Sequence, residues 1–436
     1  METQGCTIRK IAPLKGLYKV PPDESSLQRG LFILAQAVGK STISPSFISD
    51  STVSTMCCLQ HLGVEIKRIS DSRIEVYGVG VRGLSAPTDV LNIGNSRIAM
   101  HLLLGVVASY SFQTIITGYG HFLDKFKIKG VKHFSDIGIE ITSCTLPTIV
   151  KGNDYCVPHI HILEHSCSQI KSALLMAGLN TKGTTTIVEP FSGSTNHTEL
   201  MLKHLGADIT IIRSKENTKT TICGIPELRP QDIIIPGDPS ITLFLVAAAT
   251  LIPGSEITIE GICLNEDRLR VYRILREMSA DINTTISGKN LGNKIGSINV
   301  KSARLNGVTI KESDISIDNF QILLFLLCTA NGKSSIENNK GLKISSKLHK
   351  FIEIMQELGA IIEVTDTSIN IEGTTLDGGK SINARYDYLL GNILILSGFV
   401  SRKPITMYNY RPHWFDLYYN ADKVKPSHNG KKSTHS

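Results

Sequence analysis

The sequence is poor in aromatic residues and has no pattern of cysteines that would bind a metal. Phe, Trp and Tyr make up 6% of the 436 residues, and there is one Trp. The nine cysteines are scattered without a Cys-x-x-Cys pair, so neither an iron–sulfur nor a structural zinc spacing is present. We therefore expect a mainly aliphatic core and reduced thiols in the cytoplasm.

The sequence also lacks an apolar run long enough to cross a membrane. Runs such as 241–253 and 320–330 are about a dozen residues long, shorter than the ~20 that a bilayer requires. The first residues, Met-Glu-Thr-Gln-Gly, do not resemble the start of a secretory signal. These runs predict buried helices and no membrane partner.

Charge is present but not concentrated. The net charge is +7, and residues 422–436 contribute four Lys and one Asp to it. Residues 421–436 are therefore expected to form a basic, disordered tail. The rest of the chain has no dense Arg/Lys stripe with interleaved aromatics, which argues against a nucleic-acid partner and leaves small anions as the expected ligands.

One short pattern, a small residue followed by a polar, β-rich stretch, recurs along the whole chain. The copies begin at Gly39, Ser111, Gly183, Gly254, Gly332 and Ser401, at intervals of 72, 72, 71, 78 and 69 residues. This period exceeds the ~20 to 50 residues of most solenoid repeats. Because the length suits two domains of about 200 residues, we predict two α/β lobes of three units each.

Each copy follows an apolar segment that is too hydrophobic for a surface helix and therefore predicts a core helix. The six segments are 27–38, 98–110, 170–179, 241–252, 320–330 and 389–400. A second helix in each unit ends in a recurring motif such as His61-Leu-Gly-Val-Glu-Ile, in which the Gly suits a helix cap. The fourth copy reads Met278-Ser-Ala-Asp-Ile, and the sixth lacks this half.

Polar residues stand before every core helix. They are Asp23 and Ser25, Asn95 and Ser96, Ser166 and Ser168, Asp238 and Ser240, Asp318 and Asn319, and Asp387. Each could simply cap its helix. If the helices point into one cleft, their free N–H groups also form anion sites, and six together favour an anionic ligand.

Three longer motifs resemble the enolpyruvyl transferase family, most closely its 3-phosphoshikimate branch. They are Pro236-Gly-Asp-Pro-Ser-Ile-Thr-Leu-Phe-Leu-Val-Ala-Ala-Ala, Cys167-Ser-Gln-Ile-Lys-Ser-Ala-Leu and Ser194-Thr-Asn-His-Thr-Glu. Weaker matches, among them Leu91-Asn-Ile-Gly-Asn-Ser and Leu264-Asn-Glu-Asp-Arg, occur in the expected order. The resemblance spans residues 7 to about 416.

The resemblance implies a two-lobed inverse α/β barrel built from six βαβαββ-type repeats, with the ligand cleft between the lobes. It implies a first lobe at 21–235 and a second lobe at 1–20 plus 236–420, joined by chain crossings near Val20-Pro21 and Ile235-Pro236. The last repeat would be truncated.

The resemblance further implies transfer of the enolpyruvyl group of phosphoenolpyruvate to shikimate 3-phosphate, by a monomer without metal or cofactor. Asp318 would take the proton of the acceptor hydroxyl. The substrate-binding residues would be Ser25, Arg29, Asn95, Lys125, Ser168, Gln169, Lys171, Ser194 and His197. For single residues the plainer interpretations are a helix cap for Asp318, a surface lysine for Lys171 and a hydrogen-bonded structural histidine for His197.

Several charged positions depart from the family pattern. Glu24 stands where the family has a phosphate-binding Lys, and Ser346 replaces a proton-transfer Glu. An Arg of the fifth unit becomes His349, an Arg of the sixth becomes Leu389, and a Lys aligns with Asn409.

Three hypotheses follow from these departures. In the first, the enzyme is active and anion binding has passed to Arg97, Lys125, Lys127 and Arg411. In the second, the chain is a catalytically impaired homologue that binds an anionic metabolite or a partner. The third, transfer to a UDP-amino sugar, ranks last because the cysteine-bearing loops do not match the glycine-rich motif of that branch.

Overall fold

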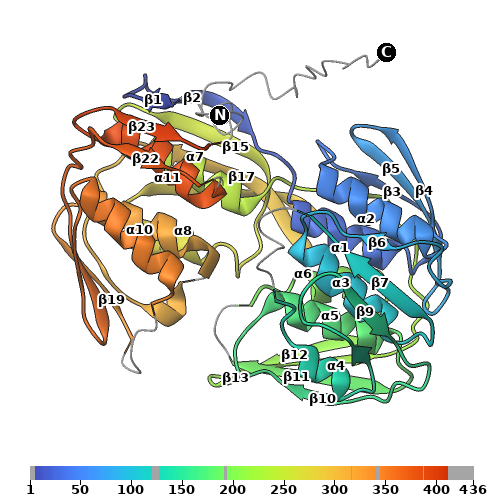
Figure 1. Ribbon diagram of the computed structural model, residues 1–436. Coiled ribbons are helices and arrows are strands. Elements are labelled where there is room, and N and C mark those ends of the chain that lie inside the picture. The colour runs from blue at the N-terminus through green and yellow to red at the C-terminus, as the bar shows by residue number, and fades with distance from the viewer. Residues whose placement is uncertain are drawn as a thin grey trace, which may run out of the picture.

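The computed structural model describes residues 5–119, 127–190, 194–315, 317–338, 344–385 and 387–410. Lys125, Arg411 and the predicted tail at 421–436 lie outside these ranges. Two lobes stand side by side, and the N-terminal segment runs from one lobe to the other (Figure 1). The predicted two-lobed α/β architecture is confirmed.

The first lobe holds three four-stranded sheets. Its strands are β3 (Val38–Ser44), β4 (Glu65–Ser70), β5 (Arg73–Val79), β6 (Leu91–Asn92), β7 (Gln113–Thr117), β8 (Glu140–Ile141), β9 (Thr148–Lys151), β10 (Ile160–Ile162), β11 (Thr184–Pro190), β12 (Ile209–Arg213), β13 (Asn217–Cys223) and β14 (Ile233–Ile234). The sheet orders are β14-β3-β5-β4, β6-β7-β9-β8 and β10-β11-β13-β12. In each sheet the first pair is parallel and the other two pairs are antiparallel.

The second lobe repeats this topology. Its strands are β1 (Cys6–Ile8), β2 (Lys15–Lys19), β15 (Glu256–Cys263), β16 (Asp281–Asn290), β17 (Asn293–Lys301), β18 (Thr309–Lys311), β19 (Lys333–Glu337), β20 (Ile361–Val364), β21 (Ser368–Glu372), β22 (Ser381–Asn383) and β23 (Ile405–Tyr408). The orders are β16-β17-β15-β2, β18-β19-β21-β20 and β1-β23-β22. Within the described residues the sixth sheet has three strands, in agreement with a truncated last repeat.

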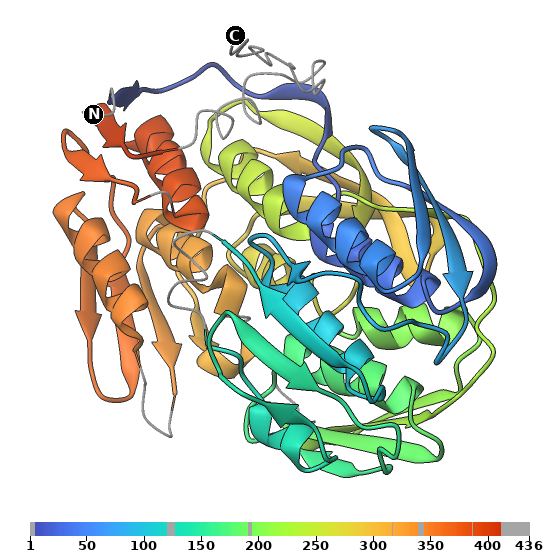
Figure 2. The same ribbon diagram turned by 45° about the vertical axis from the view of Figure 1, so that its right-hand side comes forward.

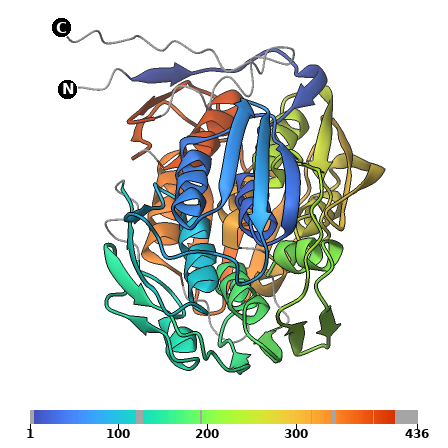
Figure 3. The same ribbon diagram turned by 90° about the vertical axis from the view of Figure 1, so that its right-hand side faces the viewer.

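The helices form two sets. The core helices are α1 (Glu24–Leu34), α3 (Arg97–Val107), α5 (Ser168–Leu179), α7 (Pro239–Leu251), α9 (Phe320–Thr329) and α11 (Tyr388–Val400). The outer helices are α2 (Asp50–His61), α4 (Val131–Ser135), α6 (His197–His204), α8 (Arg270–Glu277) and α10 (Ser346–Glu357), and short 3₁₀ turns form η2 (Glu312–Asp314) and η3 (Ile317–Asn319). Core helices run together inside each lobe, and sheets cover them from outside (Figures 2 and 3).

The predicted core helices exist, but the first was predicted to run too far. The apolar pattern continues from Leu34 to Val38, whereas α1 ends at Leu34 and β3 begins at Val38. Residues 35–37 are buried in the turn between helix and strand, so their hydrophobicity reflects burial and not helix. Apolar content alone does not distinguish the two.

The prediction that the recurring glycines cap the second helices of their units is confirmed. Gly63, Gly138, Gly206 and Gly359 follow outer helices with φ of 93°, 85°, 105° and 99°. This left-handed conformation is easy for Gly and strained for other L-residues. Ser279 takes the same place in the fourth unit with φ 72°.

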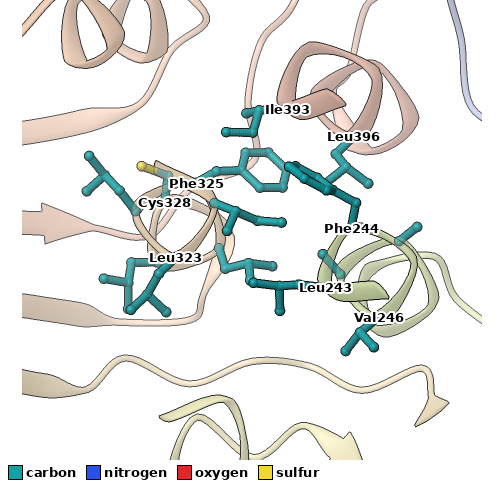
Figure 4. Packing of buried hydrophobic residues seen from close by; sticks show 14 of the residues in the cluster. Leu243, Phe244, Val246, Leu323, Phe325, Cys328, Ile393 and Leu396 are labelled. Carbon is teal, nitrogen blue, oxygen red and sulfur yellow. The ribbon is translucent and has the colours of Figure 1, made fainter. Parts of the chain in front are cut away.

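Each lobe has its own hydrophobic core. In the second lobe, side chains of α7, α9 and α11 point toward one another, with Phe244 and Phe325 near the centre (Figure 4). The first-lobe core is built around α1, α3 and α5 and also includes Leu291, from the turn between β16 and β17. No described helix is long and apolar enough to span a membrane.

The two chain crossings between the lobes lie side by side. The Asp23 amide donates to the Pro236 carbonyl at 2.8 Å, and the Asp238 amide donates to the Pro21 carbonyl at 2.9 Å. Each crossing therefore holds the other in place at the root of the cleft. The exact limits of the lobes, at residues 20/21 and 235/236, stay a prediction.

Candidate active site between the lobes

The N-termini of the core helices differ in how they are capped. Asp23, Ser96, Asp238 and Asp387 each accept a backbone N–H from the first turn of their own helix. At α5 and α9 the capping residues are Cys167 and Asn319, and neither side chain makes a capping hydrogen bond. Because free first-turn N–H groups attract anions, the start of α5 retains the stronger anion-binding capacity, whereas α9 continues directly from the 3₁₀ turn η3. Capping by Ser166, Ser168 or Asp318 at these two helices is not what the structure shows.

A hydrogen-bonded chain connects the predicted residues of α1 and α5. Arg29 donates from Nη1 to the Ser25 carbonyl at 3.1 Å and also to the Ser25 hydroxyl. Its Nε donates to Thr198 Oγ1 at 2.9 Å. Thr198 Oγ1 lies 2.8 Å from Ser172 Oγ, and Ser172 donates to the Ser168 carbonyl at 2.6 Å. Burial lowers the pKa of Arg29 to about 10, which leaves the guanidinium charged at neutral pH.

Lys171 lies inside the first lobe and not on its surface. Its side chain is 2% exposed, and Nζ lies 2.7 Å from a carboxylate oxygen of both Glu189 and Glu199. Nζ also donates to Ser194 Oγ at 2.5 Å, and Ser194 donates to Glu189 at 2.6 Å. Burial alone would lower the pKa of Lys171, but the two carboxylates more than offset this effect and raise it. The interpretation as a surface lysine is therefore wrong, and the role in substrate binding stays a prediction.

Charged groups from both lobes meet where the chain crosses. Asp23 and His197 belong to the first lobe, and Asp238 and Arg268 to the second. Burial opposes ionisation of Asp23, yet the positive charge of Arg268 holds the pKa of Asp23 below its ordinary value. Burial raises the pKa of Asp238 to about 6, and the nearby Asp23 charge adds to this effect. The crossings therefore contain a tightly balanced charge cluster.

His197 is buried next to this cluster. Burial lowers its pKa to about 3, although the Asp23 carboxylate opposes the shift, so the ring is neutral at physiological pH. Within the described part of the chain, neither ring nitrogen has a hydrogen-bond partner. The interpretation as a hydrogen-bonded structural histidine is therefore not supported.

Asp318 lies in η3, immediately before α9, and is exposed. Its charge acts on two arginines: it opposes the lowering of the pKa of Arg97, which burial causes, and it helps to raise the pKa of Arg268. Arg97 belongs to the first lobe and Arg268 to the second. An accessible carboxylate can accept a proton, and arginines from the two lobes can hold an anionic reactant.

A cavity of about 270 Å³ lies beside the crossings and is bounded by both lobes. Its lining is Pro21, Pro22, Glu24, Leu27, Phe47, Ser49, Thr52, Asp238, Ile241, Tyr388 and Asn392. Glu24 accepts hydrogen bonds from Ser49 Oγ at 2.7 Å and from Gln28 Nε2 at 3.3 Å. The two charged groups of this lining are thus carboxylates, and the predicted binding residues are not part of it.

The remaining predicted residues occupy separate places. Asn95 is exposed before α3, Gln169 is half-buried in the first turn of α5, and Lys125 lies outside the described residues. In the units that depart from the family pattern, Lys347 of α10 forms an ion pair with Asp387 at 2.6 Å. The structure thus brings together the residues of α1, α5 and α6, whereas Asn95 stands apart.

Sequence reasoning missed the groups that hold these residues in place. Thr198 and Glu199 lie inside the motif Ser194-Thr-Asn-His-Thr-Glu, and Ser172 lies inside the α5 motif. All three side chains are buried. A threonine and a glutamate on the inner face of an otherwise apolar unit were the available signal, because buried polar groups need partners.

Comparison with known proteins identifies the family of the chain. The family model for EPSP synthase (3-phosphoshikimate 1-carboxyvinyltransferase) matches residues 8–412. The 3-phosphoshikimate 1-carboxyvinyltransferase of Paramagnetospirillum magneticum is 31% identical over 409 residues, which cover 92% of each chain. That of Desulforamulus reducens is 31% identical over 399 residues, covering 90% of this chain and 92% of the relative.

Solved structures show the same fold. EPSP synthase from Acinetobacter baumannii superposes with a TM-score of 0.82 at 25% identity, over 96% of this chain and 98% of that one. The enolpyruvyl transferase NikO from Streptomyces tendae, at 17% identity and a TM-score of 0.72, shares the fold over 97% of this chain. The match over residues 8–412 and the two-lobed repeat architecture lead to one conclusion: this chain belongs to the EPSP synthase family.

Proposed function

We propose that the protein transfers the enolpyruvyl group of phosphoenolpyruvate to the 5-hydroxyl of shikimate 3-phosphate and releases phosphate. The observation that carries this proposal is the position of Asp318, an exposed carboxylate in the turn that leads directly into the core helix α9. Its charge also favours the charged forms of Arg97 from one lobe and Arg268 from the other. Family membership supplies the identity of the two substrates. Both are anionic, and they suit the start of α5, which has no side-chain cap.

In the proposed reaction Asp318 accepts the proton of the acceptor hydroxyl as its oxygen attacks C2 of phosphoenolpyruvate. A proton adds to C3 to give a tetrahedral intermediate. Loss of phosphate from C2 and of a proton from C3 then restores the enol ether. Arg97 and Arg268 would balance the negative charge near Asp318. Ser346 stands at the position of the family's glutamate, and a serine hydroxyl is too weak an acid to donate the C3 proton, so another acid must supply it.

The substrate-binding residues are part of the proposal. They are Ser25, Arg29, Asn95, Lys125, Ser168, Gln169, Lys171, Ser194 and His197. The hydrogen bonds that link Ser25, Arg29 and Ser168 support a shared role for these three. We also propose a monomer that acts in the cytoplasm without metal or cofactor. All nine cysteines are free thiols, as a reducing compartment requires.

The test measures phosphate release from phosphoenolpyruvate with and without shikimate 3-phosphate. Asp318→Ala should lower the rate by at least about 100-fold, the usual worth of a positioned proton acceptor. Asp314→Ala, which removes an exposed carboxylate from the neighbouring turn η2, is the matched control and should keep the wild-type rate.

Two other outcomes would change the assignment. Calorimetric binding of shikimate 3-phosphate without phosphate release would identify a catalytically impaired homologue that binds an anionic metabolite. Neither binding nor release would contradict the proposed substrates and leave the family fold alone.

A further inference from the structure

Helices α1 and α5, which carry several of the predicted substrate-binding residues, are connected by a third helix. Helix α6 packs against both α1 and α5. Its residue Thr198 contacts Arg29 of α1 and Ser172 of α5 through the same hydroxyl oxygen. One side chain of α6 therefore connects Arg29 to α5 by hydrogen bonds.

The chemistry of the groups fixes the direction of every hydrogen bond in this chain. Arg29 Nε can only donate, so Thr198 Oγ1 accepts from it. At the other end the Ser168 carbonyl can only accept, so the proton of Ser172 points to it. Ser172 thus has no proton left for Thr198, and Thr198 must donate to Ser172 Oγ. Reversal of any bond would leave a buried donor or acceptor unpaired.

The residues in the middle of this hydrogen-bonded network are more deeply buried than those at its two ends. Arg29 is 3% exposed, Thr198 1% and Ser172 2%. Ser25 and Ser168, where the chain ends, are both half-buried in the first turns of their helices. Water cannot replace a lost bond in the middle without a rearrangement, and any rearrangement is passed to the two ends.

We propose that Thr198 and Ser172 are positioning residues, which hold Arg29 and the first turn of α5 in one fixed arrangement for a phosphorylated acceptor. Neither residue needs to touch the ligand. Their effect is preorganisation: an Arg29 already held at Nε and Nη1 loses little freedom when an anion binds. The identity of the acceptor as shikimate 3-phosphate rests on the proposed function.

The central experiment replaces Thr198 with Val, which keeps the shape and removes the hydroxyl. The Kd of shikimate 3-phosphate, measured by calorimetry, and its KM should both rise about tenfold, a typical loss when a buried arginine is no longer held. The kcat should stay within about twofold, because ground state and transition state lose the same contact. Thr198→Ser restores the hydroxyl and should restore both constants.

The matched control is Thr250→Val in α7. Thr250 is also a helical threonine, 2% exposed, and its hydroxyl has no hydrogen-bond partner among the described residues. This variant should bind and turn over like wild type. Should Thr198→Val fail to fold, Ser172→Ala removes the next hydrogen bond of the network and should show the same rise in KM. In the Thr198→Val/Ser172→Ala double variant the two effects should not add.

A second readout separates this inference from the proposed function. In ¹⁵N NMR spectra the Nε–H signal of Arg29, assigned with Arg29→Lys, should move in Thr198→Val and not in Thr250→Val. The amide signals of Ser168 and Gln169, which make no hydrogen bond to Thr198, should move with it. Unchanged signals, or a KM equal to that of wild type, would overturn the inference. A wild-type protein that neither binds nor reacts would overturn the proposed function instead, and the NMR result would still decide on the chain of bonds.

Discussion

The two lobes share one topology but differ in what their core helices bury. Around α1, α5 and α6 the first lobe buries Arg29, Lys171, Glu189, His197 and Glu199, each 3% exposed or less. In the second lobe the charged groups removed from solvent include Asp238, Asp267 and Arg268, which interact with charged groups of the first lobe, whereas α7, α9 and α11 meet through Phe and aliphatic side chains (Figure 4). Buried charges cost stability unless they are paired, whereas apolar packing supplies it. The first lobe thus carries paired charges in its interior, whereas the second lobe has a mainly apolar interior and contributes Asp318 and Arg268 to the proposed site.

The largest expected effect concerns the buried charges of the first lobe. Lys171→Met should lower the free energy of unfolding by about 4 kcal/mol, because it leaves Glu189 and Glu199 buried without a cation. Urea denaturation measures this. Lys301→Met, which removes a fully exposed partner of Glu256, is the control and should leave the denaturation midpoint unchanged. Equal midpoints for the two variants would contradict the buried ion pair.

The second effect tests the apolar lobe. Leu323 is fully buried in α9, so Leu323→Ala should lower the free energy of unfolding by about 3 kcal/mol through lost burial and a cavity. The Kd of shikimate 3-phosphate should remain that of wild type below the melting temperature. A large loss of affinity in this variant would show that packing around α9 also controls the binding site.

A smaller effect concerns the charge cluster at the crossings and depends on pH. Because burial raises the pKa of Asp238 to about 6, the folded protein binds a proton that the unfolded chain gives up near pH 4. The contribution of Asp238 to stability should therefore fall as the pH rises from about 4 to 6. Asp238→Asn avoids the buried charge and should be more stable than wild type by about 1 kcal/mol at pH 7, with no difference at pH 4.

Thermal unfolding at the two pH values tests this prediction. An equal difference at both would mean that the substitution acts through the cap of α7 and not through ionisation. Asn is a good helix cap, so the first turn of α7 should be preserved.

The smallest effect concerns the residues that end the outer helices in different repeats. Ser279→Gly should raise the free energy of unfolding by about 0.5 kcal/mol, because it relieves the left-handed strain at φ 72° and costs some chain entropy. Calorimetry would detect it as a higher Tm. The opposite substitution at an equivalent cap, Gly359→Ser, should lower the Tm, and a fall for both would contradict the shared cap conformation.

The sequence predicted the fold in more detail than it predicted the site. The repeat, its helix caps and the pairing of apolar helices with β-rich stretches follow from local residue preferences, and each unit repeats the same signal. The end of α1 was missed because Ala35 and Ala37 are buried in a turn. The sequence showed that Glu24 departs from the family pattern, but it did not show which residues Glu24 contacts in the fold.

The site was harder to predict because its partners are distant in the chain. Arg29 meets Thr198 across 169 positions, and Arg213 of the first lobe meets Asp267 of the second across 54. No local pattern indicates which of several buried threonines will contact an arginine. Lys171 shows the same limit: its place in a motif suggested a surface or ligand contact, and only the fold revealed its two glutamates.

The strand β2 has a consequence for how the protein is made. It belongs to the sheet that also contains β15 and β17, although more than 200 residues of the first lobe lie between β2 and β15 in the chain. As a ribosome produces the polypeptide, the first lobe can fold while β2 still waits for its neighbours. The β2 strand is thus an unpaired edge during most of synthesis, and the second lobe is completed by the oldest and the newest parts of the chain together.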